Sequence, residues 1–200
     1  HDHGVDLLDL GWSPSGLMHA GRGRVQVRPG YADKPVTRVT WDAALRFCAA
    51  KGKRLPTEAE WEFAARGSAR RLFPWGQRPP RCAEVVVERL PGQPCAEPAP
   101  APRDVGTTPG DRTPEGVLDL GGNVEEWVQD QFLVPYPTCV AGCQSPLADG
   151  PLAAGQRDLR VFRGSSWMGW GFLSRGAGRG RGGRTSGFVN TGFRCAASVR

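Results

Sequence analysis

The sequence predicts an α+β domain in which two helices pack on small antiparallel sheets and loops make up much of the chain. Two helical patterns follow each other early, whereas short strand patterns are confined to the second half, and this segregation is typical of α+β folds. The chain has 28 glycines and 18 prolines, 46 of its 200 residues, and 39% of its residues are hydrophobic. This composition lies just below the level at which disorder is expected, so we predict a packed but loop-rich domain.

Residues 1–34 are turn-rich, with "GWSPSG" and "GRGRVQVRPG", and they contain one short strand pattern at Val25–Val27. We treat residues 1–34 as an N-terminal segment, a remnant of a longer N-terminal half, and residues 35–200 as the domain. The opening "HDH" would bind copper or nickel only through a free amine at residue 1, so we interpret it as a frayed start. No apolar run approaches the roughly 20 residues of a membrane span, and no charged-then-apolar leader is present. We therefore expect a removed signal or a fragment.

Two helices are expected within residues 40–67. Thr40 suits an N-cap and Gly52 a helix end. Between them, apolar residues recur at helical spacing: Trp41, Ala44, Leu45 and Cys48. In the second helix Thr57 and Glu60 form a capping-box pattern and Gly67 marks the end. An acid–base pair among Glu58, Glu60 and Glu62 is the weaker interpretation, because their spacing scatters them around the helix.

Residues 68–115 show no regular period, and a loop of this length in a compact domain is usually functional or constrained. Cys82 and Cys95 bracket the apolar stretch "AEVVVERL", so we expect a disulfide to constrain it. Short strand patterns follow in "GVLDL", "NVEEWVQD", "LRVFRGSSW" and "TGFRCAASV", which together predict the antiparallel sheet.

The six cysteines, an even number without a C-x-x-C pair, favour three disulfides. Disulfides persist in oxidising compartments, so we predict a secreted, periplasmic or cell-surface protein. Buried free thiols in a cytosolic protein are the alternative. No histidine follows His19, which argues against a zinc site.

The net charge is +6, and eight arginines lie between residues 157 and 194. A basic face of this kind would attract an acidic protein, an anionic polymer or nucleic acid, although solubility alone explains the charge as well. Residues 160–184, "RVFRGSSWMGWGFLSRGAGRGRGGR", have the composition of a disordered arginine–glycine tail. Their tryptophans, phenylalanine and leucine would be costly to leave in water, which favours an ordered segment.

Five motifs in order carry a resemblance to a known family: "PVTRVTWDAALRFCAAKGKRLPTEAEWEFAARG", "FPWG", "GVLDLGGNVEEWVQD", "VFRGSSW" and "GFRCA". From Pro35 to Ala197 the chain resembles the formylglycine-generating enzyme (sulfatase-modifying factor) family. The resemblance implies an irregular C-type-lectin-like fold. It also places residues 160–194 in the family's ordered terminal strand–loop–strand unit.

Aerobic enzymes of this family bind copper through two cysteines in the loop after "RGGS-aromatic" and oxidise a substrate cysteine. Counted from Ser166, the resemblance places those cysteines at Gly169 and Ser174. Neither residue supplies the thiolate that copper(I) prefers or forms a mixed disulfide with a substrate. We therefore expect no bound copper and no cysteine oxidation at this loop.

The resemblance further implies a structural calcium site with the side chains of Asp119 and Glu126 and the backbone oxygens of Gly122 and Val124 as ligands, an oxygen-only set of the kind calcium takes. The alternative is that the two carboxylates cap a turn or pair with arginines. A second family calcium site is expected to be lost, because Glu84 replaces an asparagine.

The resemblance also implies that Cys48 pairs with Cys195. The remaining Cys82, Cys95, Cys139 and Cys143 can pair in three ways. Proximity favours Cys82 with Cys95 and Cys139 with Cys143.

The sequence thus predicts a calcium-stabilised binding or structural module that acts through its terminal loop. Aromatic residues and arginines dominate binding hot spots, and the loop offers such residues at Trp167, Trp170, Phe172, Arg175 and Arg179, with Trp167 as a core candidate. The partner is expected to be an unknown protein or acidic ligand, with nucleic acid the weakest choice. The rival hypothesis is an oxidoreductase, such as a formylglycine-generating oxidase with differently placed ligands.

Overall fold

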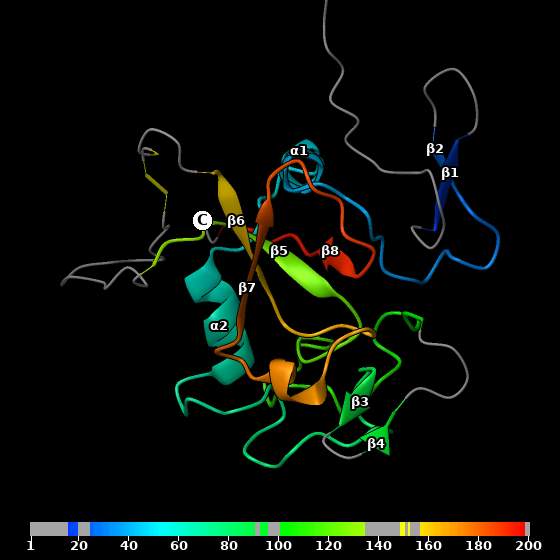
Figure 1. Cartoon of the computed structure of the whole chain (residues 1–200), viewed down its shortest axis with the longest axis vertical. Coiled ribbons are helices and arrows are strands. Elements are labelled where there is room, and N and C mark those ends of the chain that lie inside the picture. The colour runs from blue at the N-terminus through cyan, green and yellow to red at the C-terminus, as the bar shows by residue number, and fades with distance from the viewer. Residues whose placement is uncertain are drawn as a thin grey trace, which may run out of the picture.

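A computed structural model describes residues 16–19, 25–90, 93–95, 101–134, 149–150, 152 and 157–198. The expectations for the "HDH" start and for Cys139 and Cys143 lie outside these residues. In chain order the elements are β1 (Leu17–His19), β2 (Val25–Val27), α1 (Trp41–Ala50), α2 (Glu58–Arg66), β3 (Arg89–Leu90), β4 (Gln93–Pro94), β5 (Glu125–Gln131), β6 (Leu159–Arg163), the 3₁₀ helix η1 (Gly171–Ser174), β7 (Arg179–Gly183) and β8 (Thr191–Phe193) (Figure 1).

Both predicted helices form, and each begins after its predicted N-cap; α2 also ends at the predicted Gly67, whereas the C-cap of α1 is Lys51, one residue before Gly52. The Thr40 side chain accepts a hydrogen bond from the Ala43 amide at the start of α1. At the start of α2, Thr57 and Glu60 form a complete capping box. Each of these two N-caps accepts hydrogen bonds from backbone amides that have no partner within the helix.

The central sheet has four strands in the order β7-β6-β5-β8. β6 runs antiparallel to both neighbours, as predicted, but β8 runs parallel to β5, with Glu125 opposite Thr191. The sheet is therefore mixed, because the chain crosses from β7 at one edge to the opposite edge before forming β8. The predicted strand at "GVLDL" is reduced to an isolated bridge between Arg112 and Leu118, since the chain turns at Asp119, where φ is +58°.

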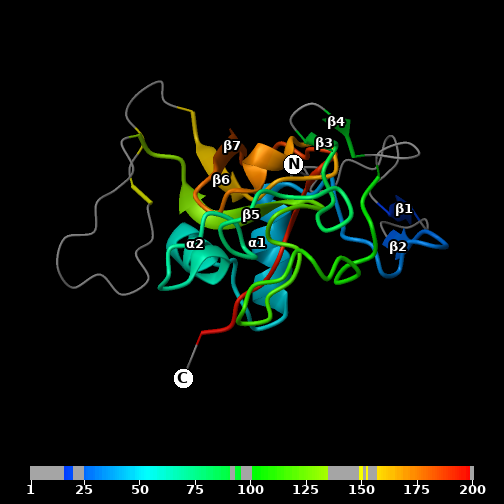
Figure 2. The same cartoon turned by 90° about the horizontal axis from the view of Figure 1, so that it is seen from below.

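The two helices cover the same side of the sheet, whereas η1 and β3 lie on the other side (Figure 2). One core cluster joins α1 to the sheet, and its fully buried members are Ala44, Cys48, Leu55 and Trp127. A second cluster joins α2 to the sheet through Trp61, Ala65, Leu120, Val128 and Val161. The indole of Trp41 donates to the Val128 carbonyl at 2.7 Å, and that of Trp127 donates to the Val39 carbonyl at 3.0 Å. Both tryptophans thereby satisfy their polar atom inside the core.

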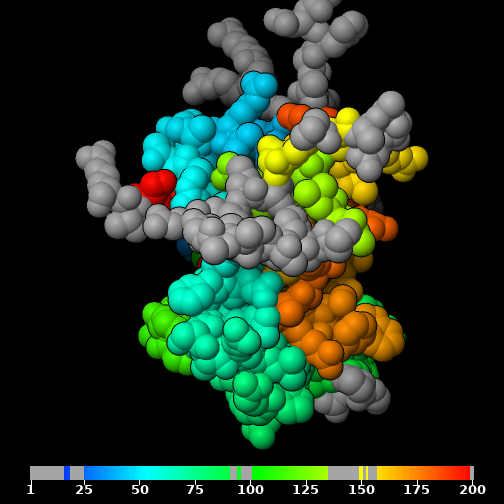
Figure 3. All heavy atoms as spheres, turned by 90° about the vertical axis from the view of Figure 1, so that its left-hand side faces the viewer, coloured from blue at the N-terminus to red at the C-terminus, as the bar shows by residue number. Residues whose placement is uncertain are grey.

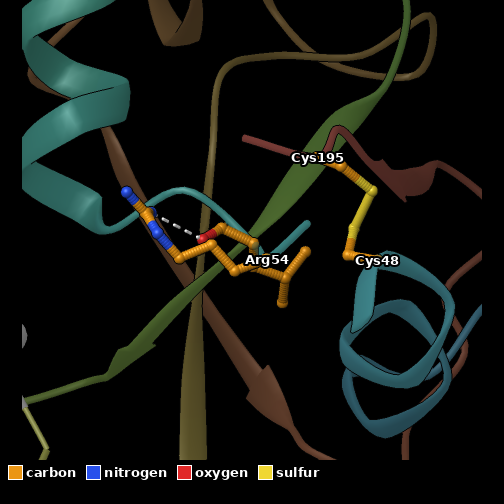
Figure 4. The surroundings of a disulfide bond; sticks show 4 residues. Cys48, Arg54 and Cys195 are labelled. Atoms are coloured by element: carbon orange, nitrogen blue, oxygen red, sulfur yellow. Dashed lines mark hydrogen bonds between the residues drawn. A yellow bond between two sulfur atoms is a disulfide. The ribbon is translucent and has the colours of Figure 1, made fainter. Parts of the chain in front are cut away.

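Two disulfides are present among the described residues. Cys48 of α1 is bonded to Cys195, just after β8, with 5.5 Å between their Cα atoms (Figure 4). Cys82 is bonded to Cys95 and closes the segment that contains the β3–β4 hairpin. Both predicted pairings are confirmed, and the second restrains the long irregular stretch.

The arginine–glycine segment is ordered. It forms β6, η1 and β7, and it lies beside α2 in the space-filling view (Figure 3). Its glycines permit close packing: a Cβ at Gly180 would overlap the Phe162 ring, and one at Gly182 would overlap the Phe188 ring. Glycine is required at these two positions because aromatic rings occupy the space of a side chain.

Candidate functional site

The terminal loop presents a cluster of large apolar side chains to solvent. Met168, Trp170, Phe172 and Leu173 are exposed by 44%, 44%, 48% and 39%; we call these four residues the terminal-loop surface. The rings of Trp170 and Phe172 meet edge to face at 6.0 Å, and the Arg89 guanidinium lies 5.1 Å from the centre of the Trp170 ring. Several large apolar side chains exposed on one loop are typical of interaction sites in soluble proteins.

Three of the five predicted surface residues are accessible, and two have other roles. Trp170, Phe172 and Arg175 are exposed. Trp167 is only 9% exposed and packs with Val86 and Val124 in the core. Arg179 donates to both carboxylate oxygens of Glu58 at 2.6 and 2.9 Å. The sequence pattern did not separate these roles, because it places aromatic and arginine residues in one loop without showing which side chains point inward.

The two positions at which the resemblance places catalytic cysteines are closed. A Cβ at Gly169 would overlap Ser165 Oγ and lie 3.1 Å from the Ser166 nitrogen. Ser174 is 1% exposed, and its hydroxyl has no hydrogen-bond partner among the described residues. No cysteine stands anywhere between Cys143 and Cys195. This loop therefore offers a substrate thiol neither a metal-binding thiolate nor an accessible nucleophile.

Beneath the loop, a buried ion network ties α2 to the sheet. The side chains of Glu58 and Arg163 are both 0% exposed, and Arg163 Nη1 lies 3.1 Å from Glu58 Oε1. Arg163 Nη2 donates to Glu62 at 2.6 Å and to the Gly176 carbonyl at 2.7 Å. Glu58 and Glu62 thus converge on one arginine, an arrangement that requires β6 to lie across α2. Sequence reasoning missed this network.

The arginines of the terminal segment are largely neutralised within the fold. Five of the eight between residues 157 and 194 form ion pairs with carboxylates: Arg160, Arg163, Arg179, Arg184 and Arg194. Arg181 lies 4.9 Å from the centre of the Phe132 ring. Most of the predicted basic face is therefore used for internal contacts.

The loop between residues 118 and 126 holds a second cluster of polar groups. Asp119 and Glu126 line a cavity of about 370 Å³ together with Arg194. Arg194 donates to the two oxygens of Glu126, both at 2.6 Å. The Trp61 indole also donates to Glu126, at 2.8 Å. Asp119 accepts from the Gly106 amide at 2.6 Å.

Burial perturbs Asp119, which lines this cavity, and Asp111, whose carbonyl accepts from the Asp119 amide. Burial raises the pKa of Asp111 to about 7, although the Gly121 amide donates to its carboxylate. Burial also raises the pKa of Asp119 from its usual value, against the hydrogen bond from Gly106 and the charge of Arg194. Removing a carboxylate from water disfavours its charged form.

The predicted calcium ligands are engaged with protein groups in this arrangement. Arg194 forms an ion pair with the Glu126 carboxylate, and the Gly122 carbonyl accepts a hydrogen bond from the Val124 amide at 3.0 Å. Within the described residues, no group of three or more His, Cys, Asp and Glu side chains is placed to hold a metal. The donor set fits a guanidinium better than a calcium ion, which would have to displace Arg194. Calcium binding stays a prediction from the resemblance.

A melting experiment separates the two alternatives. If Arg194 is the permanent partner of Glu126, EDTA should leave the melting temperature unchanged. Arg194→Gln should then destabilise the fold by about 2 kcal/mol, because the variant strips Glu126 of its charged partner. For a chain of this size that corresponds to a shift of roughly 4–8 °C. A drop in melting temperature with EDTA, reversed by added calcium and lost in Asp119→Ala, would establish the calcium site instead.

A membrane-spanning helix is not found in the described parts of the chain, since none of their helices is both long and apolar enough.

The chain is similar to proteins of one family along almost its whole length. Residues 6–199 match the family described as "Sulfatase-modifying factor enzyme 1-like domain". The chain is 36% identical over 180 residues to the serine/threonine-protein kinase pkn1 of Chlamydia pneumoniae, with 88% of this chain and 26% of the relative covered. It is 35% identical over 179 residues to the "Inactive C-alpha-formylglycine-generating enzyme 2" of Bos taurus, with 82% of this chain and 50% of the relative covered.

A third relative is the formylglycine-generating enzyme of Mus musculus, 34% identical over 173 residues, with 83% of this chain and 45% of the relative covered. The chain thus spans about a quarter to a half of the length of these relatives.

Solved structures share the fold. PvdO from Pseudomonas aeruginosa superposes with a TM-score of 0.62 at 24% identity, covering 93% of this chain and 69% of PvdO. Treponema denticola variable protein 1 superposes with a TM-score of 0.58 at 20% identity, covering 80% of this chain and 70% of that protein. These likenesses confirm the predicted fold class, and the family match confirms the predicted resemblance. The chain belongs to the sulfatase-modifying factor enzyme 1-like domain family.

Proposed function

We propose that this domain is a binding module that uses its terminal-loop surface and does not carry out copper-dependent oxidation of cysteine. The proposal rests on two features of the same loop, its exposed apolar side chains and its lack of catalytic cysteines. Four large apolar side chains are exposed there, while the positions expected for catalytic cysteines are a glycine without space for a side chain and a buried serine.

The rigidity of the loop supports a binding role. The Ser166 carbonyl accepts from the Gly169 amide at 2.7 Å, and the Gly169 carbonyl accepts from the Glu88 amide at 2.9 Å. Aromatic side chains held on such a frame lose little conformational freedom when a partner covers them. One relative bears the name of an inactive enzyme, which is in keeping with a family member that has lost the chemistry.

We further propose that the domain works in an oxidising compartment, secreted, periplasmic or at the cell surface. The two disulfides and the absence of a free thiol among the described cysteines support this assignment, because disulfides are rare in reducing compartments. The partner in such a compartment would be a protein or an acidic ligand; the internal pairing of most terminal-segment arginines argues against nucleic acid.

The activity test compares this chain with the mouse formylglycine-generating enzyme. Each protein is supplied with copper(I), oxygen, reductant and a sulfatase-type cysteine peptide, and the peptide is followed by mass spectrometry. We expect conversion by the mouse enzyme and none above the protein-free control by this chain, because its loop lacks the thiolates. Conversion by this chain would overturn the proposal in favour of an oxidase with differently placed ligands.

A further inference from the structure

A pocket of about 400 Å³ opens beside the terminal-loop surface. Its apolar walls are formed by Leu72, Phe73, Pro79, Pro80, Leu90 and Phe172. Gln77 and Arg175 supply its polar side chains. The volume lies in the range of ligand sites, which are mainly apolar with a few polar groups that fix orientation. Phe172 belongs both to the pocket and to the terminal-loop surface, so the two are continuous.

The pocket walls are held in place by close backbone packing. η1 lies so near the opposite wall that a Cβ at Gly171 would overlap Leu90 and lie 3.1 Å from Pro80. The Gly176 amide donates to the Leu72 carbonyl at 3.0 Å. The Cys82–Cys95 disulfide closes the segment that carries Leu90. A ligand would therefore enter a largely preformed site and pay little ordering entropy.

Arg175 gives the pocket a positive charge that no described carboxylate neutralises. Its side chain is exposed, and none of the ion pairs found among the described residues includes it. The acids of the neighbouring segment are already paired: Glu84 with Arg78, and Glu88 with Arg89. An arginine at the edge of an apolar pocket is suited to a carboxylate, which it can hold through two parallel hydrogen bonds.

We propose that this pocket binds a segment of a partner protein in which an aliphatic or aromatic side chain stands next to a carboxylate. The apolar side chain fills the pocket, and the carboxylate pairs with Arg175. The rest of the segment crosses the exposed Trp170 and Leu173, an extended apolar area that a small molecule confined to the pocket would leave uncovered. The inference rests on the proposed binding function, since it names the partner chemistry of the same surface.

The test uses peptides selected from a random displayed library on the intact wild-type chain, then synthesised with a fluorescent label. We expect the selected peptides to share an apolar–acidic pair. Replacing the acid by its amide should weaken binding about tenfold, as for loss of one charged hydrogen-bonded pair. Arg175→Gln should weaken the parent peptide equally and make the amide peptide bind no worse than the acid, since the two changes remove one interaction.

Arg46→Gln is the matched control, because it removes an exposed arginine from α1, on the opposite side of the sheet (Figure 2). It should leave the acid–amide difference intact. Melting temperatures of both variants should match that of the wild type, since both side chains are exposed.

The outcomes separate the inference from the proposed function. If acid and amide peptides bind equally, while Trp170→Ser and Phe172→Ser still weaken both, the carboxylate partner is overturned and the binding module stands. If phenylacetate displaces the peptide at equal concentration, the pocket is a small-molecule site and the inference fails. If the wild type selects no peptide, or if Trp170→Ser and Phe172→Ser leave binding unchanged, both proposals fall.

Discussion

Removal of the Cys48–Cys195 disulfide should lower the free energy of unfolding by about 5 kcal/mol. The two cysteines are 147 residues apart, and a cross-link stabilises mainly by restricting the unfolded chain, to a degree that grows with the length of the closed loop. Cys48 is also fully buried in the core cluster of α1. The double variant Cys48→Ala/Cys195→Ala avoids a free thiol, and urea unfolding followed by tryptophan fluorescence measures the change.

The second disulfide supplies the matched control. Cys82 and Cys95 are only 13 residues apart, so Cys82→Ala/Cys95→Ala should cost about 3 kcal/mol by the same argument. Equal costs for the two double variants would contradict the chain-entropy explanation. Peptide mapping without reduction should recover Cys48 linked to Cys195. Alkylation of Cys48 before reduction would refute that bond in the purified protein and, with it, the oxidising compartment.

Glu58→Gln should destabilise the domain by about 3–5 kcal/mol, the usual cost of removing one partner from a buried ion pair. The variant keeps the shape of the side chain but leaves two arginines without their shared carboxylate. Arg163, whose side chain is fully buried, loses its 3.1 Å contact to Glu58 and keeps its contact to Glu62. Arg179 loses both of its contacts to Glu58. Chemical denaturation gives the change in the free energy of unfolding.

An exposed pair provides the comparison for this variant. Lys34 and Asp104 lie 3.1 Å apart with half of the Asp104 side chain in water, so Asp104→Asn should change stability by less than about 1 kcal/mol. If Glu58→Gln costs no more than Asp104→Asn, the buried network does not stabilise the fold. In that case the role of the network is to fix how α2 meets β7, and Glu58→Gln should change the hydrogen-exchange protection of β7 alone.

Both predictions concern the frame that holds the terminal loop. Glu58 pairs with Arg163, at the end of β6, and with Arg179, at the start of β7, and the loop runs between these two strands. The Cys48–Cys195 bond fixes the chain just after β8, which pairs with β5 at the other edge of the sheet. The exposed aromatics of the loop are thus carried on a stabilised scaffold, as a binding surface requires.

The sequence by itself determined the helices, their starts and the fold class. Thr40, Thr57 and Glu60 act on amides within three residues of themselves, and signals of such short range can be read without knowing the rest of the fold. The pairing of Cys82 with Cys95 was likewise accessible from proximity. The ordered terminal segment and the Cys48–Cys195 bond followed from the family resemblance, because the motifs stand in family order.

Only the tertiary structure decided which polar groups meet and which aromatic residues face water. Glu58 is 105 residues from Arg163 and 121 from Arg179, and Glu126 is 68 residues from Arg194. No local pattern encodes such pairs, since they depend on how β6, β7 and β8 are brought against α2 and β5. The same packing buries Trp167 and exposes Trp170, three residues apart in one loop. Burial is set by what lies across the loop, and that information is absent from the loop's own sequence.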